Sequence, residues 1–180
     1  MNRCCMDRME SNEIKQDEKK LLFELIKNAK ENTETIGRHC GFSKQKVARL
    51  IKQLEQKKFI WGYTTVVDEK KIEQNHFVLM AKKSSKKIDE KTVDLIVSRT
   101  LEKRAAEQGI FIESSFYVHG EYDWVLTCTA EDVLHAKKFS EELIKHFPGI
   151  FEKITILQTM MFIRNQYILN PEKEKLKDFL

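Results

Sequence analysis

The chain has 180 residues, of which 41% are hydrophobic, which is enough material for two modest cores. No apolar run approaches the roughly eighteen residues of a membrane span, and no apolar signal region begins the chain, so we expect a cytoplasmic protein without a membrane partner. The net charge of +4 falls within residues 1–68, with fourteen Lys/Arg against ten Asp/Glu, whereas residues 69–180 have eighteen of each. A local basic excess of this kind attracts a phosphate backbone.

The first part of the chain predicts two helices and a tight turn. Residues 1–12 show no hydrophobic period, and we expect a disordered tail. Residues 17–29 place leucines at helical spacing behind an acidic first turn, which predicts a first helix. Residues 34–40 predict a short second helix, and Gly41 follows where a helix ends in a left-handed turn.

A basic amphipathic helix follows this turn. Ser43 can cap its N-terminus, and its apolar positions follow the i, i+3, i+4, i+7 spacing of a buried stripe. Amides and cations that can contact base edges and phosphates fall opposite that stripe. Taken alone, such a helix is also explained as an ordinary solvated surface helix, but the two preceding helices and the turn favour a helix-turn-helix. The stripe comprises Val47, Leu50, Ile51 and Leu54, and the opposite sector comprises Gln45, Arg49, Lys52 and Gln56.

Residues 59–67 are β-branched and aromatic, which predicts a strand or hairpin and hence a winged helix-turn-helix over residues 13–67. We expect Trp61 to pack on the helices. Residues 68–74 form a charged linker. The predicted DNA-binding residues are Ser43, Lys44, Gln45, Lys46, Arg49, Lys52, Gln56, Lys57 and Lys58.

A second domain is predicted over residues 75–165, followed by a tail at 166–180. The expected elements are a strand at 75–82, a long helix at 89–107, a strand at 110–119, a strand at 123–129, a helix at 131–147 and a strand at 150–163. This βαββαβ order is typical of a ferredoxin-like fold, with both helices on one face of an antiparallel sheet. The fold class is therefore α+β. The other face of the sheet would be bare and apolar, and the simplest partner for it is a second copy of the chain.

The titratable residues do not predict a catalytic or metal site. Cys4, Cys5, Cys40 and Cys128 lack metal-ligand spacing, and we expect the last two to be buried thiols. The five histidines are scattered. We therefore expect no cofactor, no metal and no catalytic residue.

With these elements in place, the chain resembles the Lrp/AsnC (feast/famine) transcriptional regulators over nearly its full length. In the first domain the resemblance is carried by Gly41-Phe42-Ser43, Val47, Arg49, Ile51, Leu54-Glu55, Ile60, Gly62-Tyr63 and Val67-Asp68. In the second domain it is carried by Val118, Gly120-Glu121, Asp123 and Phe147-Pro148-Gly149-Ile150.

The resemblance implies a homodimer on double-stranded DNA, with tetramers or octamers as further assemblies, and an effector that is often an amino acid. The residues that correspond to the family's effector site are Gly120, Glu121, Tyr122 and Asp123, with Thr155 and Gln158 as weaker candidates for the opposite wall. Two interpretations stay open: Asp123 bonds an effector's α-amino group, or Gly120 and Asp123 serve only the local turn.

The chain departs from the family pattern in two places. Lys58 stands where a glycine usually ends the recognition helix, and the helix at 89–107 is about two turns longer than usual.

Two other functional classes are alternatives. One is a ligand-sensing or assembly module that no longer binds DNA. The other is an enzyme similar to the siroheme decarboxylases, which would use His119, Tyr122 and Arg164, although no spacing in the sequence demands it.

Overall fold

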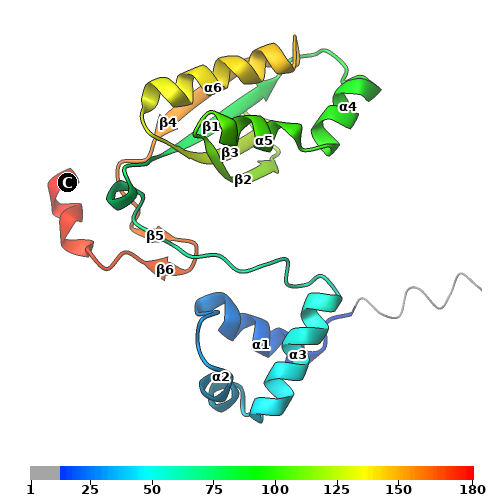
Figure 1. The fold of residues 1–180 in the computed structure, drawn as a ribbon, viewed down its shortest axis with the longest axis vertical. Coiled ribbons are helices and arrows are strands. Elements are labelled where there is room, and N and C mark those ends of the chain that lie inside the picture. The colour runs from blue at the N-terminus through cyan, green and yellow to red at the C-terminus, as the bar shows by residue number, and fades with distance from the viewer. Residues whose placement is uncertain (1–12) are drawn as a thin grey trace, which may run out of the picture. The chain divides into compact units, whose positions relative to one another are not determined.

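A computed structural model describes residues 13–180, so the expected disordered tail and the adjacent Cys4 and Cys5 lie outside the described residues. The described chain forms two compact units (Figure 1). One unit comprises residues 67–162, and the other comprises residues 13–66 with 163–180. Within the described part, no helix is long and apolar enough to cross a membrane.

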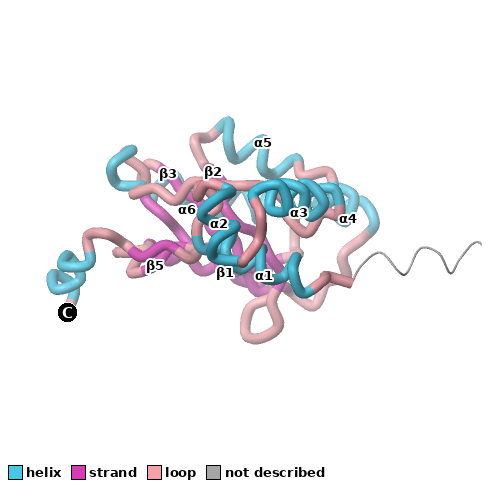
Figure 2. Tube along the Cα trace, turned by 90° about the horizontal axis from the view of Figure 1, so that it is seen from below, coloured by secondary structure: helices cyan, strands magenta, loops and turns pink. Residues whose placement is uncertain are grey.

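The helical unit contains the three helices expected from the sequence, joined by short turns (Figure 2). They are α1 (Gln16–Lys27), α2 (Thr33–Cys40) and α3 (Lys44–Gln56). One apolar face of each helix contributes to a common core, which confirms the predicted helix-turn-helix scaffold. The core comprises Leu21, Leu25, Ile36, Cys40, Val47, Leu50 and Leu54.

The turn between α2 and α3 depends on two glycines. A Cβ at Gly37 would lie 2.6 Å from the carbonyl oxygen of Phe42, so only glycine lets the turn approach α2 this closely. Gly41 adopts a left-handed conformation with φ of 69°, as the sequence predicts for the residue that ends α2. The Ser43 hydroxyl oxygen then accepts a hydrogen bond from the Lys46 amide at 3.2 Å and caps α3.

The end of α3 keeps the shape that a glycine would give it, although Lys58 occupies the position. Lys58 has a φ of 59°. Its N–H donates to the Glu55 carbonyl at 3.0 Å, and the Phe59 N–H donates to the Leu54 carbonyl at 2.9 Å. This pair of bonds is a Schellman motif, which normally has glycine at the left-handed residue. The substitution therefore preserves the geometry of the helix end at the cost of backbone strain in Lys58.

A buried carboxylate joins the first and third helices. The Glu18 side chain is only 2% exposed. Its carboxylate accepts hydrogen bonds from the Lys15 amide at 2.8 Å and from the Lys57 ammonium at 2.9 Å. The Lys15 bond first, and then the Lys57 bond, hold the pKa of Glu18 below its ordinary value. The ion pair fixes the start of α1 against the end of α3.

The strand expected at residues 59–67 is not formed: after the turn at the end of α3, residues 60–67 are assigned no strand. A strand needs a hydrogen-bonding partner, and no other described strand pairs with this segment. The expectation that Trp61 packs on the helices is wrong, because its side chain is 96% exposed. Two hydrogen bonds tie the segment to α3: the Ile60 N–H donates to the Leu54 carbonyl at 3.3 Å, and the Tyr63 hydroxyl donates to the Glu55 carboxylate at 3.0 Å.

The second unit is the predicted ferredoxin-like sheet. Its strands are β1 (Asn75–Lys83), β2 (Phe111–Tyr117), β3 (Trp124–Ala130) and β4 (Phe151–Gln158), and the 3-10 helix η1 (Glu69–Ile72) precedes them. The order across the sheet is β2-β3-β1-β4, and every neighbouring pair is antiparallel. Helix α6 (Val133–His146) follows β3. Ala136, Phe139 and Leu143 on α6 are buried in the core, whereas Val133, Leu134 and Ile144 on the same helix are exposed.

The two faces of the sheet differ in how they are covered. Side chains alternate between faces along each strand, so cross-strand partners share a face. One face packs under the helices and includes Phe77, Leu79, Ala81, Leu126 and Cys128, all 3% exposed or less. The opposite face carries apolar side chains, as predicted from the strand composition, together with Thr127, Thr155 and Lys82. Its apolar residues are Val78, Met80, Phe111, Phe116, Val125 and Leu157, of which Phe111 is 55% exposed; we call these six residues the open face.

The single long helix expected at 89–107 is two helices, α4 (Glu90–Val97) and α5 (Thr100–Glu107), which Figure 1 shows as separate coils. Arg99 between them has a φ of 52°, which no helix interior allows. The break lets Ala105 on α5 reach the core, where it is 1% exposed. Val93 and Val97 on α4 remain exposed.

The C-terminal segment differs from the expectation in two respects. Strand β4 ends at Gln158 instead of continuing to residue 163. A short hairpin of β5 (Arg164–Asn165) and β6 (Ile168–Leu169) follows, and η2 (Lys173–Phe179) is a 3-10 helix near the end of the chain.

The strain at Lys58 predicts that Lys58→Gly will stabilise the helical unit. Removing the Cβ relieves a left-handed residue, and we expect the free energy of unfolding to rise by about 1 kcal/mol. Urea unfolding followed by circular dichroism measures the change. Lys52→Gly, in the middle of α3, is the matched control and should lower stability by about 1 kcal/mol. A loss of stability in Lys58→Gly would contradict the assignment of strain.

The Glu18 ion pair predicts a loss of stability in acid. Because the folded-state pKa is below the ordinary value of 4.5, the contribution is complete above about pH 4.5 and is lost as the pH falls through the lowered folded-state pKa. We expect Glu18→Gln to lower the free energy of unfolding by about 1–3 kcal/mol at neutral pH. The difference from the unsubstituted protein should shrink in acid. Glu34→Gln, an exposed change on α2, should show neither effect, and a pH-independent difference at Glu18 would refute the account.

Candidate nucleic-acid interface

The exposed side of α3 carries most of the residues predicted to contact DNA. The side chains of Lys44, Gln45, Arg49, Lys52 and Gln56 are all exposed. Among residues 13–180, no hydrogen bond or ion pair engages the charged ends of Lys44, Arg49 or Lys52. Three cations and two amides therefore project from one helix with their bonding capacity unused.

Two other predicted cations are already paired within the helical unit. The Lys46 ammonium lies 2.6 Å from the Asp17 carboxylate and 4.0 Å from the centroid of the Phe42 ring. The Lys57 ammonium lies 2.9 Å from the Glu18 carboxylate. These pairs span 29 and 39 residues along the chain, so local sequence spacing did not reveal them. The acidic first turn of α1 was the available signal.

The remaining predicted residues have structural roles that constrain them. The Ser43 hydroxyl oxygen caps α3 with one of its two lone pairs, which leaves the O–H and one lone pair available. Lys58 is exposed, and its left-handed backbone fixes the direction in which its side chain leaves the end of α3. The free charges are thus concentrated along α3 itself, with Lys58 at its end.

This arrangement can recognise a duplex in two ways. An arginine can donate two hydrogen bonds to a guanine edge, and a glutamine can bond an adenine edge, which gives sequence preference. A lysine neutralises phosphate without reading sequence. Arg49 and Gln45 are therefore the candidates for base contacts, and Lys44 and Lys52 are the candidates for phosphate contacts.

The second candidate site is the loop between β2 and β3. Asp123 is held by three local bonds: its carboxylate accepts from the Lys83 amide at 2.7 Å, its N–H donates to the Ala81 carbonyl at 3.0 Å, and its carbonyl accepts from the Val118 amide at 2.9 Å. The residue thus pins the base of the loop to the end of β1. The other carboxylate oxygen makes no hydrogen bond within the described residues.

Gly120 is not required by the turn itself. Its φ lies outside the left-handed region, and a Cβ built at this position would have no heavy atom within 4 Å. Gly120 and Glu121 are both exposed. The backbone of the loop is therefore exposed at Gly120, although the space there would accept a larger side chain.

The structure brings together only part of the expected effector set. The hydroxyls of Tyr122 and Thr155 lie 3.3 Å apart. Thr155 pairs with Met80 on the side of the open face, whereas Gln158 pairs with Phe77 on the covered side. Because side chains alternate along a strand, residues three apart point to opposite faces, and Gln158 does not join the other residues. Its amide instead donates to Asn75 at 3.3 Å.

Sequence reasoning also missed a buried histidine beside the open face. His76 is 7% exposed, and its ring nitrogens lie 2.6 Å from the Thr159 hydroxyl and 3.1 Å from the Glu113 carboxylate. The Phe162 ring packs edge-on against it at 4.7 Å between centroids.

The expected buried thiols are confirmed at Cys40 and Cys128, and burial raises the pKa of Cys128 to about 12. Within residues 13–180 no cluster of His, Cys, Asp and Glu could hold a metal ion.

No protein-family model matches the chain, and no curated protein matches it. Solved structures do match. An AsnC family transcriptional regulator from Agrobacterium tumefaciens is 17% identical, with a TM-score of 0.62, covering 87% of this chain and 97% of its own. A transcriptional regulator from Neisseria meningitidis, in complex with L-methionine, is 16% identical, with a TM-score of 0.63, covering 89% and 98%.

A third structure, LrpC from Bacillus subtilis, is 21% identical with a TM-score of 0.55, covering 84% of this chain and 98% of its own. The matches span both units of this chain and nearly the whole of each solved structure. The chain therefore has the fold of the Lrp/AsnC transcriptional regulators.

Proposed function

We propose that this protein is a sequence-specific, DNA-binding transcriptional regulator that acts in the cytoplasm as a homodimer. The observation that carries the proposal is the exposed side of α3, where Lys44, Arg49 and Lys52 have no partner among the described residues. Gly37, Gly41 and the Ser43 cap hold α3 against α2 in the arrangement of a DNA-reading unit.

The open face supports the homodimer. An apolar face of six side chains on a regular sheet is a typical site of association, and a second copy offers the same face in self-complementary form. A dimer carries two copies of α3, which can contact two half-sites of a pseudo-palindrome about one helical turn apart.

The loop at 120–123 supports an effector site in the same protein. Gly120 and Glu121 leave the backbone of the loop exposed, and Tyr122 of the same loop places its hydroxyl 3.3 Å from that of Thr155. Amides and hydroxyls of this kind can hold a carboxylate, and an amino acid is the proposed effector class. The free oxygen of Asp123 is the acceptor available for its amino group.

The α3 side chains predict two different effects on DNA binding. Arg49→Ala should cost roughly 1–3 kcal/mol and reduce the preference between sequences, because a base contact is lost. Lys52→Ala should weaken binding to all sequences alike and reduce the salt slope by about one. Fluorescence anisotropy with a duplex from the protein's own upstream region and with a scrambled duplex, at several salt concentrations, separates the two effects.

Lys103→Ala, an exposed lysine on α5, is the matched control and should leave binding unchanged. If Arg49→Ala keeps both affinity and preference, the assignment of the reading face is wrong. Negligible binding of the unsubstituted protein to either duplex would favour a sensing module without DNA binding.

The open face predicts that Phe116→Asp will dissociate the homodimer. Phe116 is 48% exposed in the single chain, and a buried carboxylate in its place would lack a partner. We expect the dimer to weaken by at least about 2 kcal/mol, measured by sedimentation velocity over a range of concentrations. Val97→Asp, at an exposed valine on α4, should not change the mass. Equal masses for Phe116→Asp and the unsubstituted protein would rule out this face as the interface.

A further inference from the structure

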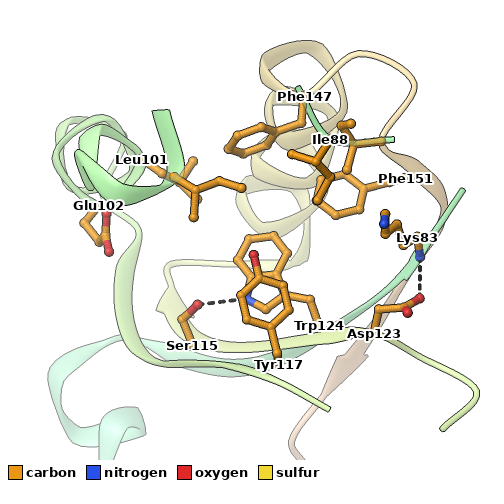
Figure 3. A pocket seen from close by; sticks show the side chains of 12 residues that line it. Lys83, Ile88, Leu101, Glu102, Ser115, Tyr117, Asp123, Trp124, Phe147 and Phe151 are labelled. Atoms are coloured by element: carbon orange, nitrogen blue, oxygen red, sulfur yellow. Dashed lines mark hydrogen bonds between the residues drawn. The ribbon is translucent and has the colours of Figure 1, made fainter. Parts of the chain in front are cut away.

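The two tryptophans of the chain lie in opposite environments. In the sheet unit, the Trp124 ring stacks on Phe151 with centroids 5.6 Å apart, and its indole N–H donates to the Ser115 hydroxyl at 2.8 Å (Figure 3). In the helical unit, Trp61 is 96% exposed, and within residues 13–180 its indole N–H has no hydrogen-bond partner. A tryptophan normally buries most of its ring and bonds its N–H. Trp61 therefore has the features of a residue that contacts a partner molecule.

The backbone around Trp61 is held against α3, although the indole itself is exposed. Phe59 and Ile60, just before it, pack on the core of the helical unit. The Ile60 N–H also donates to a carbonyl in the last turn of α3 at 3.3 Å. Two residues after Trp61, the Tyr63 hydroxyl donates to the Glu55 carboxylate at 3.0 Å. These contacts on both sides hold the indole beside the end of α3.

The free charges near this position are positive. Lys58, just after α3, is exposed, and its ammonium has no partner within the described residues. Lys52 is likewise unpaired, and it lies three residues before Glu55 on α3, so the two are neighbours on the helix surface. Glu55 is the one acidic residue of α3, and its carboxylate accepts the Tyr63 hydroxyl. The indole is thus displayed next to a surface that attracts anions.

We propose that the Trp61 indole contacts the sugar–phosphate backbone of DNA at the edge of the groove that α3 enters, an inference that rests on the proposed DNA-binding function. The flat face of an indole can cover a deoxyribose ring, and its N–H can donate to a phosphate oxygen. Lys58 supplies an ammonium for a neighbouring phosphate. A second copy of the chain would bring the same cations to this place, and like charges oppose that contact.

This position gives Trp61 a different role from Arg49. Contacts to sugar and phosphate carry no base information, so the indole contributes affinity and not sequence preference. Because the indole is neutral, it releases no counterions, and its contribution does not depend on salt as that of a lysine does.

Two substitutions separate the indole from the ammonium beside it. Trp61→Ala should weaken binding to the duplex from the upstream region and to the scrambled duplex by the same factor, at least about threefold, with the salt slope unchanged. Lys58→Ala should also weaken both, but should reduce the salt slope by about one. Phe23→Ala, at a 56% exposed aromatic residue on α1, is the matched control and should leave binding unchanged. Fluorescence anisotropy measures all three, and circular dichroism should show each variant folded.

The emission of Trp61 reports the contact directly. Trp124→Phe, a change within the sheet unit, leaves Trp61 as the only tryptophan. In this variant, added duplex should protect the indole from acrylamide, a neutral quencher. Raising the protein concentration without DNA should give no protection.

The outcomes distinguish this inference from the function on which it rests. If the unsubstituted protein binds DNA while Trp61→Ala binds equally well and acrylamide still reaches the indole, the contact is wrong and the DNA-binding function stands. Protection that appears with protein concentration alone would assign the indole to a second copy of the chain and overturn the proposal. A loss confined to the upstream duplex would contradict a backbone contact. No binding of the unsubstituted protein to either duplex would overturn both.

Discussion

The alternation of side chains across the four-stranded sheet is the constraint on which the rest of the structure depends. On one face, Phe77, Leu79 and Leu126 are buried under α5 and α6 and form the core. The same alternation necessarily directs Val78, Phe111 and Phe116 to the other face, where no described element covers them. A single chain therefore forms a complete core and leaves an apolar surface. Association with a second copy is the simplest way to cover that surface, and it would also supply the two copies of α3 that the proposed pseudo-palindromic site needs.

In the helical unit, ion pairing divides the basic residues into two groups with different roles. Asp17 and Glu18 pair with Lys46 and Lys57, which hold α1 against α3. Lys44, Arg49 and Lys52 have no such partner among the described residues, so their charges remain available to a nucleic acid. The total charge of the segment therefore overstates the charge available for binding. The paired lysines contribute to the position of α3, and the unpaired residues contribute to what α3 can contact.

The sequence predicted those features that depend on local pattern: the helices of the first unit, the Ser43 cap, the Gly41 turn and the order of strands along the second unit. It did not predict features that depend on distant residues. The break at Arg99 carries no glycine or proline signal, and the strand expected around Trp61 has no described partner to pair with. The ion pairs of Lys46 and Lys57 join residues far apart in the chain. The separation of Gln158 from Thr155 follows from the two-residue period of a strand, so the sequence alone was sufficient to predict it.

The central claim is that paired copies of α3 read DNA sequence, and the most direct test is enrichment of bound duplexes from a randomised pool by the full-length protein. The account predicts enriched duplexes that contain an inverted repeat with half-site centres about 10–10.5 base pairs apart. It also predicts that Arg49→Ala will lose this enrichment. Bound duplexes without a shared sequence, or the same repeat enriched equally by Arg49→Ala, would contradict it.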